Sequence, residues 1–239
     1  MRILTLLALL LAAPMLPVPA AAQQPSPSFD CAEATTPDEE TICESIELAE
    51  LDRLVSDAYA DFEPEFGDRT AIARDVLRDR KACARSAACI AAVYAGALRT
   101  YAPGRVPLWP SAYAEGLMLR KAEAAAANGG ANAALPRQVG ECASTTIGAL
   151  TDRFGTPLQD ADFTAGSRVE FANGAAQVSY AREDALVVSE VGDDVTICLF
   201  DRPRDCPAGD DRGSTYLTVN ENRGVYWLLT DAQHICGGA

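Results

Sequence analysis

The sequence contains few of the side chains that most enzymes use for catalysis. It has a single histidine, His234, so a Ser-His-Asp or Cys-His arrangement would depend on this one ring. The closest cysteines, Cys83 and Cys89, have five residues between them, which is not the C-x2-C spacing of a zinc site. A Gly-rich phosphate loop is absent, and no spacing singles out a glycosidase pair among the 34 acidic residues. We therefore expect a protein that is not an enzyme and that binds no metal and no cofactor.

Two acidic doublets beside glycine, Asp193-Asp194 and Asp210-Asp211, raise the question of a calcium site. Neither supplies the alternating D-x-[DN]-x-[DN]-G ligands of a calcium-binding loop. We interpret both doublets as turns, because Asp and Gly are residues that β-turns favour.

Long apolar runs are also absent. The stretch Ile3 to Leu11 is too short to span a bilayer of about 30 Å, and no later stretch reaches 18 apolar residues. It follows Arg2 and precedes a proline-containing break and Ala20-Ala21-Ala22, as in a secretory signal peptide with an A-x-A cleavage site. We predict a signal peptide at 1–22 and a periplasmic or secreted protein without stable membrane insertion. A lipid anchor is not expected, because the first cysteine, Cys31, does not follow the cleavage site.

Basic residues are scarce relative to acidic ones. The chain has 20 Lys and Arg against 34 Asp and Glu, a net charge of −14, and removal of Arg2 with the signal peptide makes it one charge more negative. Nucleic acid and anionic membranes are poor partners for such a protein. The charge favours a cationic partner, since complementary fields accelerate association. The alternative interpretation is that the acidity only keeps an exported protein in solution.

Eight cysteines, an even number, predict a disulfide framework in an exported protein. Four lie before a cysteine-free stretch, Ile90 to Glu141, and four lie after it, so we expect four disulfides and none between the two groups. The favoured pairings among several alternatives are Cys43 with Cys83, Cys31 with Cys89, Cys142 with Cys236 and Cys198 with Cys206.

The hydrophobic pattern changes at the same place as the cysteine grouping. Apolar residues recur at spacings of three and four from Ile46 to Phe62 and again over 70–101, which predicts two antiparallel helices turning near Gly67. After Cys142 the pattern becomes that of short strands between turn residues. The expected strands are 168–171, 177–180, 185–189, 195–200, 214–219 and 225–229, with a short helix at 145–154 before them.

These patterns predict an α+β protein in which a disulfide-linked helical hairpin precedes a small antiparallel β-rich domain. We place the helical domain at 29–104, a Pro, Ala and Gly-rich connector at 105–140 with a helix at 112–127, and the β-rich domain at 141–239. The two domains are expected to be separable.

Charge is segregated between the two predicted helices. From Asp30 to Phe66 there are 13 acidic residues and one basic residue, whereas from Asp68 to Arg105 there are three acidic and eight basic residues. The two segments could neutralise each other, but the excess of acid also predicts a negative face for a partner. The candidate partner-binding residues, away from the apolar stripe, are Glu44, Glu47, Glu50, Asp57 and Asp61. An ordinary solvated helix face is the competing interpretation.

Two stretches of the predicted helical domain carry a recognisable pattern. The first comprises Phe29-Asp30-Cys31-Ala32, Thr36-Pro37-Asp38-Glu39-Glu40-Thr41-Ile42-Cys43, Leu48-Ala49-Glu50-Leu51-Asp52 and Tyr59. The second comprises Leu77, Arg80 and Cys83 in the spacing L-x2-R-x2-C, followed by Ala87-Ala88-Cys89-Ile90 and Tyr94. Over 29–101 this pattern resembles the N-terminal domain of the LprI-like family, with a departure at Val76, where many relatives have tryptophan.

The resemblance implies a disulfide-linked helical module of the bacterial envelope, in a family named after a member that inhibits lysozyme. The domain is widespread, and membership of the family does not by itself imply inhibition. The hypothesis is a non-catalytic binding protein that inhibits a cationic lysozyme or binds another basic exported protein. The alternative is an envelope structural or interaction module that binds a wall component or another exported protein.

Overall fold

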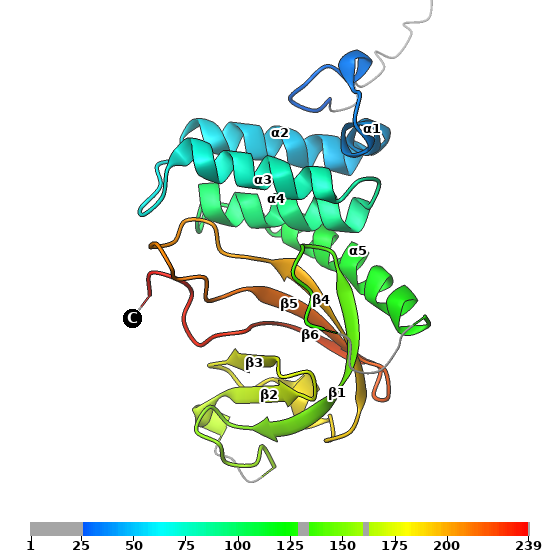
Figure 1. Ribbon diagram of the computed structural model, residues 1–239, viewed down its shortest axis with the longest axis vertical. Coiled ribbons are helices and arrows are strands. Elements are labelled where there is room, and N and C mark those ends of the chain that lie inside the picture. The colour runs from blue at the N-terminus through cyan, green and yellow to red at the C-terminus, as the bar shows by residue number, and fades with distance from the viewer. Residues whose placement is uncertain (1–25, 129–133, 160–162, 239) are drawn as a thin grey trace, which may run out of the picture.

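The protein folds into a layer of helices followed by a six-stranded antiparallel barrel, which confirms the α+β expectation (Figure 1). The computed structural model describes residues 26–128, 134–159 and 163–238, so the predicted signal peptide at 1–22 lies outside the described residues. The helices are η1 (Cys31–Glu33), α1 (Pro37–Glu44), α2 (Ile46–Ala60), α3 (Arg69–Ala82), α4 (Ala87–Tyr101), α5 (Leu108–Ala126), η2 (Phe163–Ala165) and α6 (Asp184–Val187). The strands are β1 (Cys142–Thr151), β2 (Ser167–Phe171), β3 (Ala176–Ser179), β4 (Asp194–Asp201), β5 (Thr215–Asn220) and β6 (Val225–Thr230).

Side-chain caps set the starts of the main helices. The Ser45 hydroxyl accepts a hydrogen bond from the Leu48 N–H at the start of α2, and the Asp68 carboxylate accepts one from the Ala71 N–H at the start of α3. Each of these contacts satisfies a backbone donor that the first helical turn leaves without a partner. The antiparallel reversal between α2 and α3 falls in the predicted region around Gly67.

The single helix expected over 70–101 is wrong. The chain breaks between Ala82 and Ala87, where Ala84 has a φ of 48° and Ser86 caps the start of α4. A left-handed alanine cannot continue a right-handed helix, so the chain turns and α4 runs back beneath α3. The periodicity is preserved on both sides of the break, which is why the pattern alone does not show it.

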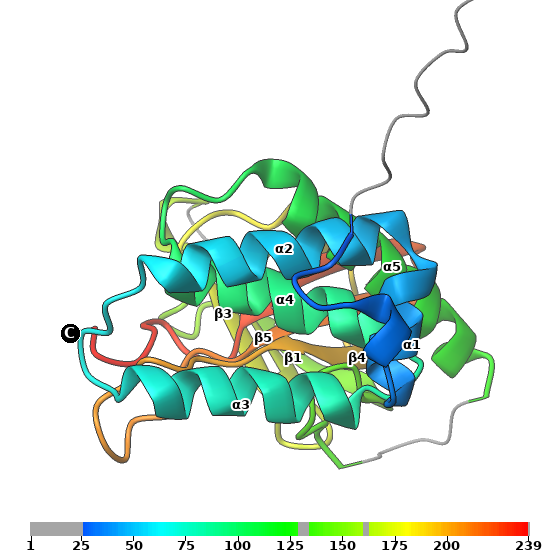
Figure 2. The same cartoon turned by 90° about the horizontal axis from the view of Figure 1, so that it is seen from above.

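Helix α4 is the centre of the molecule. Every residue from Ala88 to Leu98 is buried, at no more than 9% exposure. Helices α2 and α3 pack over one side of α4 (Figure 2), and α5 and β4 contact it from the barrel side. The helix predicted at 112–127 is part of α5, and its buried residues Ala114, Met118 and Ala122 belong to the same core as those of the barrel. The separability of 29–104 and 141–239 stays a prediction.

The barrel has the strand order β1-β2-β3-β6-β5-β4, with β4 returning to β1. Its closure between β3 and β6 consists of one residue pair, Val178 with Thr230. The side chain of Gln177, in the neighbouring register position of β3, also bridges to β5 and β6. Its Nε2 donates to the carbonyl oxygens of Tyr216 (3.0 Å) and Leu229 (3.2 Å). This fully buried amide therefore joins the strands where the backbone ladder is shortest.

Two local predictions in the β-rich half are wrong. The expected helix at 145–154 is mostly strand β1, whose β-branched residues suit a strand and whose burial alternates along Cys142–Ile147. The expected strand at 185–189 overlaps the single turn α6, Asp184–Val187. All six strands of the closed barrel already have two neighbours, so this segment has no strand to pair with.

Four disulfides form, and none joins 29–104 to 141–239, as expected. The four predicted pairings are wrong, because the observed pairs are Cys31–Cys43, Cys83–Cys89, Cys142–Cys198 and Cys206–Cys236. The break before α4 explains one of them: in a continuous helix Cys83 and Cys89 would be about 9 Å apart along the axis, too far for a bridge. The turn brings their Cα atoms to 5.4 Å.

Candidate functional site

The predicted acidic residues form one exposed face at the outer edge of the helical layer. Glu44 ends α1, Glu47, Glu50 and Asp57 lie on α2, and Asp61 is its C-cap residue. All are exposed except Glu50, which is half-buried, and the α2 positions lie outside the buried stripe of Leu48, Leu51 and Val55. Four of the five predicted residues therefore belong to α2 and its C-cap, and Glu44 precedes α2 at the end of α1. Their role toward a partner stays a prediction.

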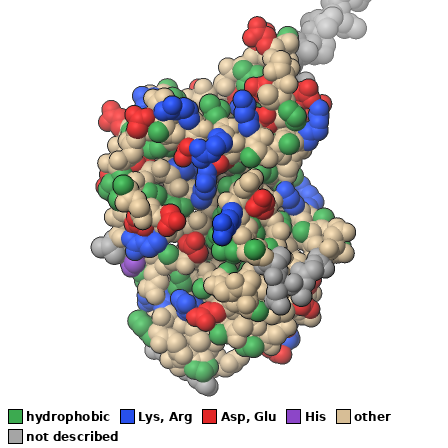
Figure 3. Space-filling model, viewed as in Figure 1, with side chains coloured by type: hydrophobic (Ala, Val, Ile, Leu, Met, Phe, Trp, Pro, Cys, Tyr) green, Lys and Arg blue, Asp and Glu red, His purple; other side chains and the backbone are tan. Residues whose placement is uncertain are grey.

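Local ion pairs neutralise only part of this face. Asp57 forms an exposed ion pair of 2.9 Å with Arg53, one turn earlier on α2. Glu44, Glu47, Glu50 and Asp61 form no ion pair with any other described residue. Figure 3 shows acidic and basic side chains intermixed over the helical layer on the side in view.

A buried charged network lies beneath the acidic face. Arg80 of α3 donates from Nε to the Asp38 carboxylate (2.7 Å), and its Nη1 lies 3.4 Å from the Tyr94 hydroxyl. Tyr94 in turn donates to Asp52 of α2 (2.6 Å), whose other oxygen accepts from the Ser28 hydroxyl (2.6 Å). Burial raises the pKa of Tyr94 well above its ordinary value, and neighbouring Asp52 adds to the rise. Tyr94 therefore stays a donor.

Four residues of the LprI-like pattern, Asp38, Asp52, Arg80 and Tyr94, make up this network. None is more than 7% exposed, so they hold α1, α2, α3 and α4 together and present no surface to a partner. The sequence pattern and the acidic face are thus two different features of the same helices.

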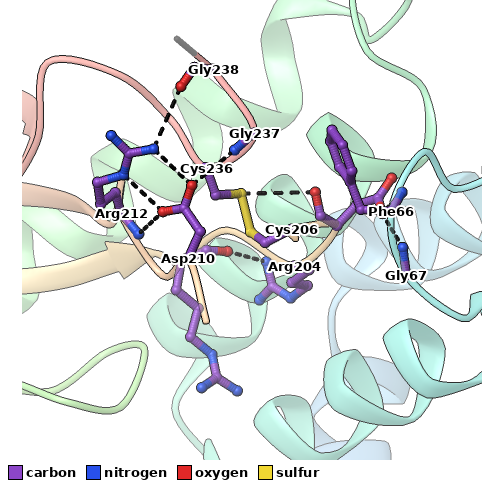
Figure 4. Close-up of a disulfide and its surroundings, with 12 residues drawn as sticks. Phe66, Gly67, Arg204, Cys206, Asp210, Arg212, Cys236, Gly237 and Gly238 are labelled. Atoms are coloured by element: carbon purple, nitrogen blue, oxygen red, sulfur yellow. Dashed lines mark hydrogen bonds and ion pairs between the residues drawn. A yellow bond between two sulfur atoms is a disulfide. The ribbon is translucent and has the colours of Figure 1, made fainter. Parts of the chain in front are cut away.

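The acidic doublets take part in turns and in anchoring the C-terminal segment. Asp193 accepts from the Glu190 N–H, from Asn220 Nδ2 and from Arg223 Nε, each at 2.9 Å. The Arg223 hydrogen bond is the largest cause that lowers the pKa of Asp193 to about 2. Asp210 pairs with Arg212 and accepts from the Gly237 N–H at 3.1 Å (Figure 4). Within the described parts of the chain, no three His, Cys, Asp or Glu side chains are grouped as metal ligands.

The loop after β4 joins the barrel to the helical layer. The Asp205 carboxylate accepts from the backbone N–H groups of Glu65, Phe66 and Gly67 at 2.6 to 2.9 Å. Next to it, the Cys206–Cys236 disulfide holds the C-terminal segment against the same turn (Figure 4). Burial alone would raise the pKa of Asp205, but the three backbone donors lower it overall. We call Asp205 with the Cys206–Cys236 disulfide the clasp.

A second candidate site, a cavity of about 730 Å³ at one mouth of the barrel, was not predicted from the sequence. Its floor consists of Phe171, Ile197, Leu199 and Tyr216, which project inward from β2, β4 and β5. Its rim is formed by the segment before β1, the β2–β3 turn and the ends of β4, β5 and β6. No local sequence signal could find it, because its lining comes from segments up to about 100 residues apart.

No protein-family model, curated protein or solved structure matches this chain. The resemblance of 29–101 to the LprI-like family therefore stays a prediction. Among the described residues, no helix combines the length and the apolar character needed to cross a membrane. Four disulfides are typical of proteins that fold in an oxidising compartment.

Proposed function

We propose that the mature protein is an exported, non-catalytic binding protein that inhibits a cationic lysozyme of the muramidase type. The observation that supports this most directly is the exposed face of Glu44, Glu47, Glu50 and Asp61, whose carboxylates have no cationic partner among the described residues. The resemblance of 29–101 to the LprI-like family points to the same class of partner.

Inhibition of this kind requires only that a rigid surface occupies the enzyme. A standard interface covers about 800 Å² on each partner. Rigidity lowers the ordering entropy lost on binding, and α2 is held rigid by the Arg80 network beneath it and by the Cys31–Cys43 disulfide that fastens α1. The acidic face would accelerate encounter with a cationic enzyme and fix the orientation of the complex.

The test compares two charge-reversal variants with equal net charge. Glu47→Lys with Glu50→Lys changes the acidic face, and Glu123→Lys with Asp194→Lys changes exposed carboxylates on α5 and β4. Association with c-type, g-type and i-type lysozymes is measured by surface plasmon resonance at low and moderate salt, and lysozyme activity by turbidity of cell walls. We expect the first variant to associate at least about tenfold more slowly and to inhibit less, because steering by facing charges is lost.

Equal effects of the two variants would show that only total charge matters and would remove the acidic face from the proposal. Full lysozyme activity at micromolar excess of the unaltered protein in low salt would contradict inhibition itself.

The second candidate function is an envelope interaction module that binds a wall component or another exported protein. The barrel-mouth cavity favours it, because a concave site with an apolar floor is suited to a small ligand and not to a large convex enzyme. A salt-sensitive complex with lysozyme distinguishes the first function from the second.

A further inference from the structure

The barrel-mouth cavity has the size and the lining of a small-molecule site. Its volume of about 730 Å³ falls within the range of roughly 300–1,000 Å³ that is typical of ligand pockets. The buried rings of Phe171 and Tyr216, with Ile197 and Leu199, give it an apolar floor. Gln177 lies at the base of this floor, but its amide is fully used within the barrel, since Oε1 accepts from Thr218 and Trp227. The floor therefore offers apolar contact, and polar recognition must come from the rim.

One side of the rim is acidic. Asp231, directly after β6, is half-buried, and its Oδ1 accepts from the Gly213 N–H at 2.9 Å. Asp211, in the loop before β5, is exposed, and neither carboxylate forms an ion pair with a described residue. Burial raises the pKa of Asp231, and the nearby Asp211 adds to the rise. A half-buried carboxylate without a counter-ion favours a cation on the open side of the cavity.

Two of the three arginines on the rim are already paired with carboxylates of the protein, and one is not. Arg202 forms a bidentate ion pair with Asp79 (2.6 and 3.0 Å), and Arg212 forms one with Asp210 (2.7 and 2.8 Å). Both guanidinium groups are therefore neutralised by carboxylates outside the cavity. The third, that of exposed Arg137, has no hydrogen bond or ion pair with a described residue.

Arg137 and Asp231 occupy different positions on the rim. Arg137 precedes β1, and Asp231 follows β6. The segment before β1 runs along β4, where the Gly140 N–H donates to the Leu199 carbonyl oxygen, and β5 lies between β4 and β6. The rim thus offers an unpaired cation near β4, unpaired carboxylates next to β5 and β6, and the apolar floor below them.

From this arrangement we infer that the barrel mouth binds a short apolar peptide with free ends, its amino group toward Asp231 and Asp211 and its carboxylate toward Arg137. The apolar side chains occupy the floor against Phe171 and Leu199. This site is separate from the acidic face of α2, so the inference does not depend on lysozyme binding.

The experiment removes each charge of the peptide and of the protein in turn. The full mature protein, with its disulfides intact, is titrated by isothermal calorimetry with leucylphenylalanine, with its N-acetyl form and with its C-terminal amide. Asp231→Asn keeps an acceptor for the Gly213 N–H, and Arg137→Gln changes an exposed side chain, so both variants should fold. Matched controls on the exposed side of α5 are Glu123→Gln and Arg120→Gln.

We expect the free dipeptide to bind and each blocked form to bind about fivefold more weakly, the upper end of the range for a partly exposed ion pair. Asp231→Asn should reduce the difference between the free and the acetylated peptide, since only Asp211 then remains, and should leave the effect of the C-terminal amide unchanged. Arg137→Gln should abolish the difference between the free and the amidated peptide only, and the control variants should bind as the unaltered protein does. Equal binding of all three peptides, or no binding at millimolar concentration, would overturn the inference.

Discussion

Arg80 shows how one side chain can join several helices. It comes from α3, contacts Asp38 of α1, and lies within 3.6 Å of Asp52 of α2 and 3.4 Å of the Tyr94 hydroxyl of α4. Burial alone would lower the pKa of Arg80, but Tyr94 and Asp38 raise it overall, so the guanidinium stays charged. Loss of this cation would leave two buried carboxylates without a counter-ion.

We therefore expect Arg80→Ala to reduce the free energy of unfolding by about 3–5 kcal/mol, the scale for breaking a buried ion pair. Tyr94→Phe, which removes one hydroxyl and keeps the ring, should cost about 1–3 kcal/mol. Arg74→Ala on the exposed side of the same helix is the control and should stay within about 0.5 kcal/mol. Urea denaturation followed by circular dichroism measures all three; equal stability of the Arg80 and Arg74 variants would contradict the role of the network.

Asp193 links stability to pH. Its pKa falls from 3.8 to about 2 in the folded protein, mainly through the Arg223 hydrogen bond. A lowered carboxylate pKa stabilises the fold above the unfolded value of 3.8, and this contribution disappears as the pH falls toward 2. Asp193→Asn should therefore be less stable than the unaltered protein near neutral pH. The difference, measured by urea denaturation at several pH values, should shrink as the pH falls below 3.8. A constant difference across this range would contradict the prediction.

At the scale of elements, the packing of α4 against the barrel depends on a single glycine. A Cβ atom on Gly96 would lie 2.0 Å from Asp201 Oδ1 and 2.8 Å from Arg204 Nη1. These two side chains form an ion pair of 2.7 Å, and Arg204 is almost fully buried. The absence of a side chain at Gly96 thus allows β4 and its following loop to approach the helix backbone.

Gly96→Ala should reduce the free energy of unfolding by about 1–3 kcal/mol, because the added methyl group overpacks this contact. The matched control is Gly116→Ala on α5, where a Cβ atom would meet only Arg120 Nη1, at 3.9 Å. Alanine is the better helix former, so the control should be neutral or stabilise by up to about 1 kcal/mol. The test is the unfolding temperature of each variant, measured by thermal unfolding. Equal shifts of this temperature in the two variants would contradict the steric argument.

The elements differ in how far the sequence predicts them. Helix α2 and strands β2 and β6 follow from periodicity, because α2 has one continuous buried stripe and the two strands alternate between two environments. Strands β4 and β5 are buried along nearly their whole length, so they follow instead from β-rich runs between turn residues. The break at Ala84, the short α6 and the β1 strand depend on which partners the chain meets after folding. Disulfide pairing is also hard to predict from the sequence, because it depends on the distances between cysteines. Those distances change when a helix break is placed wrongly. The acidic face can be predicted from the helical spacing of its residues. The cavity cannot, because its lining depends on the order of the strands in the barrel.

At the scale of the whole molecule, the sequence pattern and the packing predict different domain organisations. The change of pattern near 105–140 predicts two separable domains. In the structure α4 is buried by both halves, and the clasp fastens the α2–α3 turn to the barrel and the C-terminal segment. Separation would expose one side of α4 to water and would leave the Asp205 carboxylate without its three backbone donors.

We therefore expect the oxidised mature protein to unfold as one cooperative unit. The chain has two tryptophans, Trp109 on α5, between the two predicted domains, and Trp227, buried on β6 in the barrel. In urea, Trp109→Phe leaves fluorescence from the barrel only, and Trp227→Phe leaves it from α5 only. For each variant the fluorescence transition should coincide with loss of the helical signal at 222 nm, since two-state unfolding gives the same midpoint for every probe. A barrel transition in Trp109→Phe that is clearly separated from the helical one would instead support two domains that fold independently. The comparison is made within each variant, so a change in overall stability caused by either substitution does not affect the outcome.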